Sequence, residues 1–412
     1  MNPENNHINT LIPHLFRQEY VKLTAVLSSR FGLQHIEIAE DIASDTFLKA
    51  IEHWSLYCVP DNPQAWLYTV AKNKAKDYLK RHQLFETRIQ DEIKPKEAVS
   101  EEEFEFTEEV IADSLLSMIF VVCNPINPPS AQICLALQIL CGFSVDEIAN
   151  AFLTKHETIK KRLQRARDNF RTGDLQLRKL SKDAINERLD IVLKTLYLLF
   201  NEGYFSQNED KFIRKDLCSE AMRLTLLLVE DSLTNTSQAN ALLALMCFQS
   251  SRLQARMNEN GEAILFEEQD QSLWDEYLIN KGNYYLMSAF GKSEISKYHL
   301  EASIAYWHST QHEKKWQHIL QLYNRLLVME YSPVAALNRA FAFAKVYGNK
   351  MAIEEVAKLN LSNNSYYHGL MGYLYSGINH EQALFHYGQA LQFTKSAVEK
   401  KVLTSKIDKL KK

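Results

Sequence analysis

The stretch that most constrains the fold is residues 142–171, GFSVDEIANAFLTKHETIKKRLQRARDNFR. It contains the S/T-x-x-E spacing of a capping box twice, in Ser144 with Glu147 and in Thr154 with Glu157. In such a box the hydroxyl accepts a backbone N–H at a helix start, and the glutamate reaches back to the capping residue. The spacing therefore predicts a short helix after Ser144 and a longer one after Thr154.

Each of these two predicted helices has one apolar face. In the first helix the face is formed by Ile148, Ala149 and Phe152. In the second, apolar residues recur at helical spacing, at Ile159, Leu163, Ala166 and Phe170. Two helices joined by so short a connection and packed through apolar faces form a helix-turn-helix.

The outer face of the second helix is rich in cations and hydrogen-bonding groups. Its residues are Lys155, His156, Lys160, Lys161, Gln164, Arg165 and Arg167. A helix fits the major groove of DNA, where cations neutralise phosphates and Lys, Arg or Gln read base edges. We expect Lys160, Lys161 and Gln164 to specify bases. We expect Arg165 and Arg167 to contact phosphate. The alternative is a solvated basic helix in an ordinary bundle.

A third segment, residues 61–83, predicts a helix with a second polar face. Asn62 suits the cap and Pro63 the first turn. One face carries Trp66, Thr69, Asn73, Lys76 and Lys80, flanked by Lys72 and Arg81. Single-stranded DNA fits such a face, because bases stack on aromatic rings or form hydrogen bonds while cations follow the backbone. The alternative is that Trp66 anchors the core and the lysines are ordinary surface.

Composition limits the remaining possibilities. Twelve Gly and nine Pro in 412 residues predict an all-α chain with few elaborate loops. The net charge of −4 means that any DNA contact comes from local patches. Residues 86–109 are strongly acidic, which predicts an extended linker. Six scattered cysteines without a CxxC pair predict neither disulfides nor zinc, and we expect no metal or other cofactor.

The chain lacks the sequence signals of several other protein classes. It has no GxGxxG, Walker loop, nucleophile elbow or HExxH motif, so we expect no enzyme activity. Without an apolar run of membrane-spanning length or a signal peptide, it is predicted to be cytoplasmic.

The second half of the chain predicts further helices, at 184–200, 214–230, 238–256 and 272–289. Beyond residue 298 the helices form pairs, offset by about 33 residues between Pro333 and Tyr366, near the tetratricopeptide period. Stacked pairs expose a concave surface that binds a peptide or a neighbouring domain. A polar cluster predicts either a ligand pocket or an interhelical ion-pair network; its members are Arg252, Arg256, Glu267, Gln269, Asp270 and Trp274.

These parts, in this order, resemble an extracytoplasmic-function (ECF) sigma factor of the sigma-70 family, the promoter-recognition subunit of bacterial RNA polymerase. The resemblance rests on residues 39–47 (AEDIASDTF), 65–77 (AWLYTVAKNKAKD) and 160–167 (KKRLQRAR). It extends to the ECF group with a C-terminal tetratricopeptide-like extension. The matching residues there are 200–204 (FNEGY), 242–246 (LLALM), 268–274 (EQDQSLW) and 337–340 (LNRA).

The resemblance implies a role for each candidate residue. Asp41, Ser44 and Asp45 would bind core RNA polymerase. The −10 promoter element would be melted and held by Trp66, Thr69, Lys72, Asn73, Lys76, Lys80 and Arg81. The −35 element would be read as duplex by Thr154, Lys155, His156, Thr158, Lys160, Lys161, Gln164, Arg165 and Arg167. The C-terminal domain would offer a surface to a protein or peptide partner.

The same resemblance implies five parts. These are sigma region 2 (1–84), an acidic linker (85–110), sigma region 4 (111–173), a helical middle domain (174–290) and a tetratricopeptide-like domain (291–412). A helix-turn-helix regulator with a peptide-sensing domain is the alternative. The −10-type helix and the linker distinguish the two, because a simple operator binder needs neither.

Overall fold

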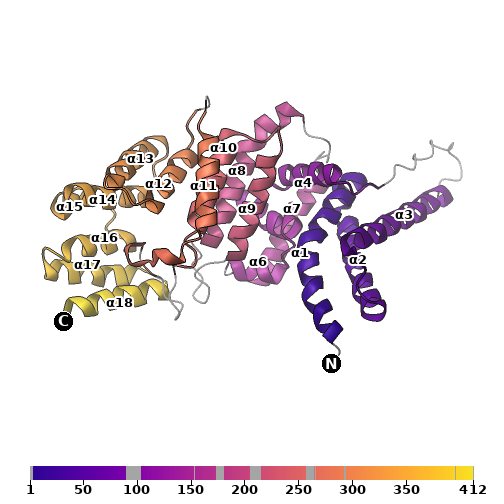
Figure 1. Cartoon of the computed structure of the whole chain (residues 1–412), viewed down its shortest axis with the longest axis horizontal. Coiled ribbons are helices and arrows are strands. Elements are labelled where there is room, and N and C mark those ends of the chain that lie inside the picture. The colour runs from indigo at the N-terminus through magenta and orange to yellow at the C-terminus, as the bar shows by residue number, and fades with distance from the viewer. Residues whose placement is uncertain are drawn as a thin grey trace. The chain divides into compact units, whose positions relative to one another are not determined.

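The computed structural model describes residues 3–89, 104–152, 154–172, 181–204, 215–256, 264, 266–291, 294–394 and 396–411. Within these ranges all regular secondary structure is helical (Figure 1), which confirms the predicted all-α class. None of the helices described there is long and apolar enough to cross a membrane. The chain divides into two compact units, Met1–Thr195 (unit 1) and Leu196–Lys412 (unit 2). The finer boundaries at 84, 110, 173 and 290 stay predictions.

Unit 1 begins with three long helices around one core. They are α1 (Pro3–Phe31), α2 (Ile36–Tyr57) and α3 (Pro63–Ile89). Trp54 is 1% exposed and packs with Phe47 and Leu67 at the centre of this core. α1 ends at Gly32, whose φ of 84° is favourable for glycine. The Gly32 N–H donates to the carbonyl of Ser28 at 2.9 Å, as expected at a helix end.

Residues just after 103 also pack against the helices of this core. Phe104 is 4% exposed and packs against Leu27 and Ala39. The Thr107 hydroxyl then accepts the Val110 N–H at 3.3 Å and starts α4 (Glu108–Val122), which packs on α1. Residues 90–103 of the predicted linker lie outside the described residues, whereas the end of the linker is part of the packed unit.

The rest of unit 1 contains the capping motif found in the sequence. Its helices are α5 (Pro129–Leu135), a π-helical stretch (Ala136–Leu140), α6 (Val145–Ala151), α7 (His156–Thr172) and the first part of α8 (Lys182–Tyr204). The Ser144 capping box is confirmed: the Glu147 N–H donates to Ser144 Oγ at 3.2 Å, and the Ser144 N–H donates to Glu147 Oε2 at 2.8 Å. The predicted longer helix begins at His156, two residues after Thr154.

Unit 2 contains a run of helices that pack on their neighbours in the chain. They are α9 (Lys215–Glu230), α10 (Ser237–Ser250), α11 (Glu276–Ala289), α12 (Lys297–Ser309), α13 (Lys315–Met329), α14 (Pro333–Tyr347), α15 (Asn349–Ala357), α16 (Ser365–Tyr375), α17 (His380–Phe393) and α18 (Ala397–Lys411). α10 contacts α9, α11 and α12, and nearly all of its residues are buried. From α12 to α18 each helix contacts the next.

Two predicted helices of unit 2 are shorter than expected. The helix predicted over 238–256 ends at Ser250, and residues 251–256 form turns. There the Ser251 carbonyl accepts the Asp275 N–H at 2.8 Å, from a residue far along the chain. The helix predicted over 272–289 begins only at Glu276, because the Asp275 side chain caps it by accepting the Leu278 N–H at 3.0 Å.

The predicted polar cluster is built largely on aromatic contacts. The guanidinium of Arg252 lies 5.0 Å from the Phe266 ring centroid, and that of Arg256 lies 3.9 Å from the Tyr204 centroid. Asp270 is exposed and accepts the Ser272 N–H at 2.9 Å at the start of a turn. The side chain of Glu267 lies outside the described residues. The arginines thus contribute cation–π contacts here.

His308 of α12 gives unit 2 a predictable pH dependence. Its ring packs against Phe266 and Trp316, with centroid separations of 4.7 and 5.5 Å. Burial, together with the charges of Arg252 and Lys315, lowers its pKa to about 3. The folded chain therefore keeps His308 neutral at a pH where the unfolded chain, with a pKa near 6.5, becomes protonated.

We expect this group alone to lower the free energy of unfolding of α12 by about 1.4 kcal/mol between pH 7.5 and pH 5.5. Stability is retained above the unfolded pKa and falls as the pH drops below it. Amide hydrogen exchange in α12 of the full chain measures the change. His308→Leu should flatten the slope, whereas His380→Gln, at an exposed position, should keep it. An equal slope in H308L and wild type would contradict the assignment.

Candidate nucleic-acid interface

One end of α3 presents the residues predicted to act at the −10 element. The Asn62 side chain caps the helix, accepting the Ala65 N–H at 3.0 Å. Trp66 is half-buried, with its ring 5.3 Å from that of Trp54. It therefore anchors the core and still keeps part of its surface in solvent, so the two interpretations of Trp66 are compatible.

Farther along α3 the polar face is open to solvent. Thr69 and Asn73 are exposed, and the Thr69 hydroxyl donates to the Ala65 carbonyl at 2.9 Å, which leaves its oxygen able to accept. The cations follow along the helix; Lys72 and Lys76 are half-buried, and Lys80 and Arg81 are exposed. This face can present hydrogen-bonding groups and positive charge to one strand of nucleic acid.

The candidate polymerase-binding residues lie on α2. Asp41 and Asp45 are exposed and Ser44 is half-buried. Asp45 pairs with Lys74 of α3 at 3.1 Å. Because the Asp45 side chain is 61% exposed and that of Lys74 30%, this ion pair adds little stability and leaves Asp45 able to change partners.

α7 brings most of the predicted −35 residues to one exposed face. The residues exposed there are Lys155, His156, Thr158, Lys160, Lys161, Gln164 and Arg165, and Thr154 is half-buried before the helix. The opposite face packs into unit 1 through Ile159, Leu163, Ala166 and Phe170, all of which are buried as predicted. His156 lies 3.8 Å from Asp146 of α6, across the connection between the two helices.

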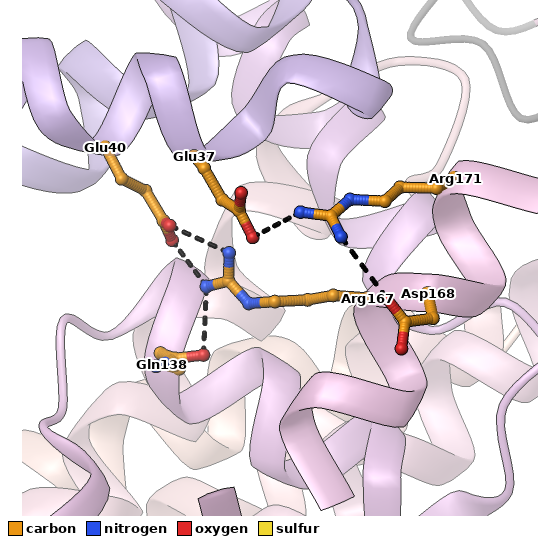
Figure 2. Close-up of polar contacts among 6 residues, drawn as sticks. All are labelled: Glu37, Glu40, Gln138, Arg167, Asp168 and Arg171. Atoms are coloured by element: carbon orange, nitrogen blue, oxygen red, sulfur yellow. Dashed lines mark hydrogen bonds and ion pairs between the residues drawn. The ribbon is translucent and has the colours of Figure 1, made fainter. Parts of the chain in front are cut away.

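Arg167 differs from the exposed cations of α7, because its side chain is mostly buried against α2. Its guanidinium forms a two-pronged ion pair with Glu40 of α2, at 2.7 and 2.8 Å, and donates to the side-chain oxygen Oε1 of Gln138 at 3.0 Å (Figure 2). The Arg167 side chain is 12% exposed and that of Glu40 17%. Burial lowers the pKa of Arg167, but the hydrogen bonds and charge of Glu40 outweigh it, so the net shift is upward.

A second, more exposed pair lies beside the first. Arg171 contacts Glu37 of α2 at 2.6 Å and Asp168 of its own helix at 3.3 Å (Figure 2). Arg167 and Arg171 are four residues apart on α7, and Glu37 and Glu40 are three apart on α2, so each pair of like charges shares one helix face. The two helices thus meet through two carboxylates and two guanidiniums.

The orientation of α7 is also held by buried amides. Asn127 donates to the Ala166 carbonyl at 3.2 Å and accepts from Asn169 at 2.9 Å. Gln132 donates to the carbonyls of Asn124 and Asn127, at 3.0 and 2.7 Å. These bonds connect the end of α7 to the turn before α5.

Sequence reasoning missed the residues that hold α7 in place, namely Glu37, Glu40, Asn127, Gln132, Gln138 and Arg171. Glu40 and Arg167 are 127 positions apart in the chain. Within the helix, Glu40 follows the ordinary pattern of a solvated face, so no local spacing indicates its partner. In the part of the chain that the structure describes, no group of three or more His, Cys, Asp or Glu side chains is placed to hold a metal.

Comparison with known proteins identifies two sequence families in the chain. Sigma-70 region 2 matches residues 15–85, and a family of unknown function (DUF6596) matches residues 188–290. The uncharacterized protein R00370 of Rhizobium meliloti (strain 1021) is 32% identical over 392 residues, covering 92% of this chain and 91% of that protein. No solved structure shows a significant match.

The region 2 match spans the helices that carry the candidate −10 and polymerase-binding residues. Residues 15–85 are therefore a sigma-70 region 2, which supports assignment of the chain to the sigma-70 family of sigma factors, a class that binds core RNA polymerase and promoter DNA in transcription initiation. The chain belongs to the same protein family as the Rhizobium protein, and the similarity extends through both units.

Proposed function

We propose that this chain is an ECF-type sigma factor that directs core RNA polymerase to specific promoters, with both DNA-reading modules in unit 1 and a regulatory helical unit after them. One observation carries the proposal: the sigma region 2 helices are followed, in the same unit, by a capped helix pair with an exposed cationic face. Bond formation belongs to the polymerase, and the chain itself contributes binding and strand separation.

At the −10 element, the exposed hydroxyl of Thr69 and amide of Asn73 receive bases that have left the duplex. Lys76, Lys80 and Arg81 lie along the same helix and neutralise the strand that carries those bases. Unpaired bases exist only after melting, so contacts to them favour the melted state over the duplex. This difference in binding is the source of strand separation.

At the −35 element, α7 acts as the second helix of a helix-turn-helix in the major groove. Lys160, Lys161 and Gln164 occupy its exposed middle and read base edges, and Arg165 contacts phosphate. The first helix, α6, starts at its capping box and packs against α7.

Unit 2 is proposed to be a working part of the initiation complex, whose paired helices bind a protein or peptide. Its support is the relative from Rhizobium, which matches through unit 2 as well as unit 1. We favour a positive role in initiation over an inhibitory one.

Run-off transcription with bacterial core RNA polymerase tests the proposal. We expect a defined transcript only when the chain is present. Asn73→Ala should reduce it on duplex template, and a pre-melted bubble should restore it, because the bubble supplies the unpaired bases directly. A chain that bound duplex operator DNA but neither co-purified with core polymerase nor produced a transcript would instead be a helix-turn-helix regulator.

A further inference from the structure

Residues of α9, α10 and α11 in unit 2 (Figure 1), with the turn after α9, line a pocket of about 420 Å³. This volume is within the range of small-molecule sites, roughly 300–1,000 Å³. Leu226 and Val229 contribute apolar surface, and the polar lining is Glu230, Asn235, Asn240, Tyr284, Tyr285 and Ser288. All of these residues lie in the segment that matches the family of unknown function, 188–290.

Three of the polar groups are left only as hydrogen-bond acceptors. An ionised carboxylate such as that of Glu230 has no hydrogen to donate. Asn240 is 5% exposed, and its Nδ2 donates to Asn235 Oδ1 at 2.6 Å and to the Thr236 carbonyl at 2.9 Å, which leaves Oδ1 to accept. The Ser288 hydroxyl donates to a carbonyl of its own helix at 3.0 Å, so only its lone pairs remain. A ligand that satisfies all three groups has to supply several donors.

The same side of the pocket is negative. α9 ends at Glu230, where the carbonyls of the last turn already carry partial negative charge, and Asp231 follows. Cations are favoured at such a helix end, but the last turn of α9, which the structure describes completely, contains no basic residue. Lys281 of α11 is not part of the lining and lies 5.6 Å from the centroid of the Tyr277 ring. A bound cation would relieve the repulsion at this end of α9.

Two tyrosine rings of α11 form the opposite wall. Tyr284 and Tyr285 meet edge to face, with ring centroids 5.2 Å apart and planes at 75°, and Tyr284 is 63% exposed. The face of an aromatic ring attracts a cation. Burial, followed by the interactions with Cys247 and Glu230, raises the pKa of Tyr285, so this phenol stays neutral. A carboxylate, ring faces and free acceptors are together the groups that recognise an amine or a guanidine.

We propose that this pocket binds a small organic cation with N–H donors, an amine or a guanidine. The charged head lies between Glu230 and the Tyr284 ring and donates to Asn240 Oδ1, while the carbon chain packs against Leu226 and Val229. The segment of unknown function is then a ligand-binding segment. The inference goes beyond the proposed sigma activity and does not depend on it, because binding is measured on the chain alone.

Isothermal titration calorimetry of the free, full-length chain with butylguanidinium chloride tests the site. Glu230→Gln should weaken binding about tenfold, equivalent to about 1.4 kcal/mol, because it removes the charge and keeps the shape. Glu354→Gln is the matched control, since it removes the same charge from an exposed position of α15 and should change binding by less than about twofold. Equal effects of E230Q and E354Q would show a response to net charge alone and would overturn the proposal.

Two further positions test the sign of the charge and the role of the ring. Lys281→Gln removes a competing positive charge from α11 and should tighten binding about twofold. Tyr284→Leu should weaken binding about threefold, whereas Tyr284→Phe, which keeps the ring face, should leave it unchanged. Tighter binding in E230Q, or weaker binding in K281Q, would contradict a cationic ligand.

A ligand series on the wild-type chain gives an independent result. Butylammonium should bind, whereas butyltrimethylammonium, which has the same charge but no N–H group, should bind at least about fivefold more weakly. Equal binding of the two would contradict the hydrogen-bonding argument. Nα-acetyl-arginine methylamide separates two sources of the cation: binding weaker than that of butylguanidinium indicates a free metabolite, and tighter binding indicates a side chain of a partner protein.

Hydrogen exchange supplies a readout that needs no variant. Saturating butylguanidinium should slow amide exchange in α9, α10 and α11 of the wild-type chain and leave α16 and α17 unchanged. Circular dichroism identifies any variant that fails to fold. Neither heat nor protection with any of the cations would end the proposal.

Discussion

Replacing Gln132 by leucine should lower the free energy of unfolding around α5 and α7 by about 3 kcal/mol. Gln132 is 3% exposed, and its amide donates to the carbonyls of Asn124 and Asn127. Leucine fills a similar volume but donates nothing. The Asn127 carbonyl then loses the Gln132 N–H, at about 1–3 kcal/mol, and the Asn124 carbonyl, which keeps the Asn127 N–H at 3.1 Å, loses one of its two hydrogen bonds at about 0.5–1.5 kcal/mol. Thr195, which donates to the Gln132 oxygen at 2.8 Å, keeps a second acceptor in the Ile191 carbonyl.

Amide hydrogen exchange in α5 and α7 of the full chain measures this effect locally. Gln34→Leu is the control, because it makes the same chemical change at an exposed position and should shift stability by no more than about 0.5 kcal/mol. Gln132→Glu should be at least as damaging as Q132L, since it places a carboxylate against two carbonyl oxygens. Wild-type exchange in Q132L would show that these bonds do not hold α7.

Replacing Gly372 by alanine should destabilise the α16–α17 pair by about 2 kcal/mol. An added Cβ would lie 2.6 Å from Cδ1 of the Tyr387 ring, which is itself 3% exposed in α17. Because a buried ring has little room to move, the two helices must separate. The gain in helix propensity from Gly to Ala, about 1 kcal/mol, offsets only part of that cost.

A second glycine in the same helix provides the matched control. At Gly369 an added Cβ meets nothing within 4 Å, so Gly369→Ala should stabilise α16 by up to about 1 kcal/mol. Urea titrations of the full chain, followed by hydrogen exchange in α16 and α17, should therefore give effects of opposite sign three residues apart. Effects of the same sign would contradict the packing argument.

Local patterns in the sequence predicted the start or end of a helix well where the deciding hydrogen bonds lie within one helical turn. The capping box of Ser144 and the end of α1 at Gly32 each depend on hydrogen bonds within a few residues. The buried face of α7 follows from spacing alone, because residues three and four apart share a helix face. The sequence also indicated the order of the modules, of which region 2 is confirmed by comparison.

Only the tertiary structure decided which polar residues of these helices meet. By helix spacing, Arg167 lies among the exposed cations of α7. Its side chain nevertheless pairs with Glu40 of α2, in sigma region 2. The Ser251 carbonyl at the end of α10 likewise accepts the N–H of Asp275, which lies well beyond it in the chain. Helix periodicity determines the face on which a side chain lies, whereas its partner depends on how helices far apart in the chain pack together.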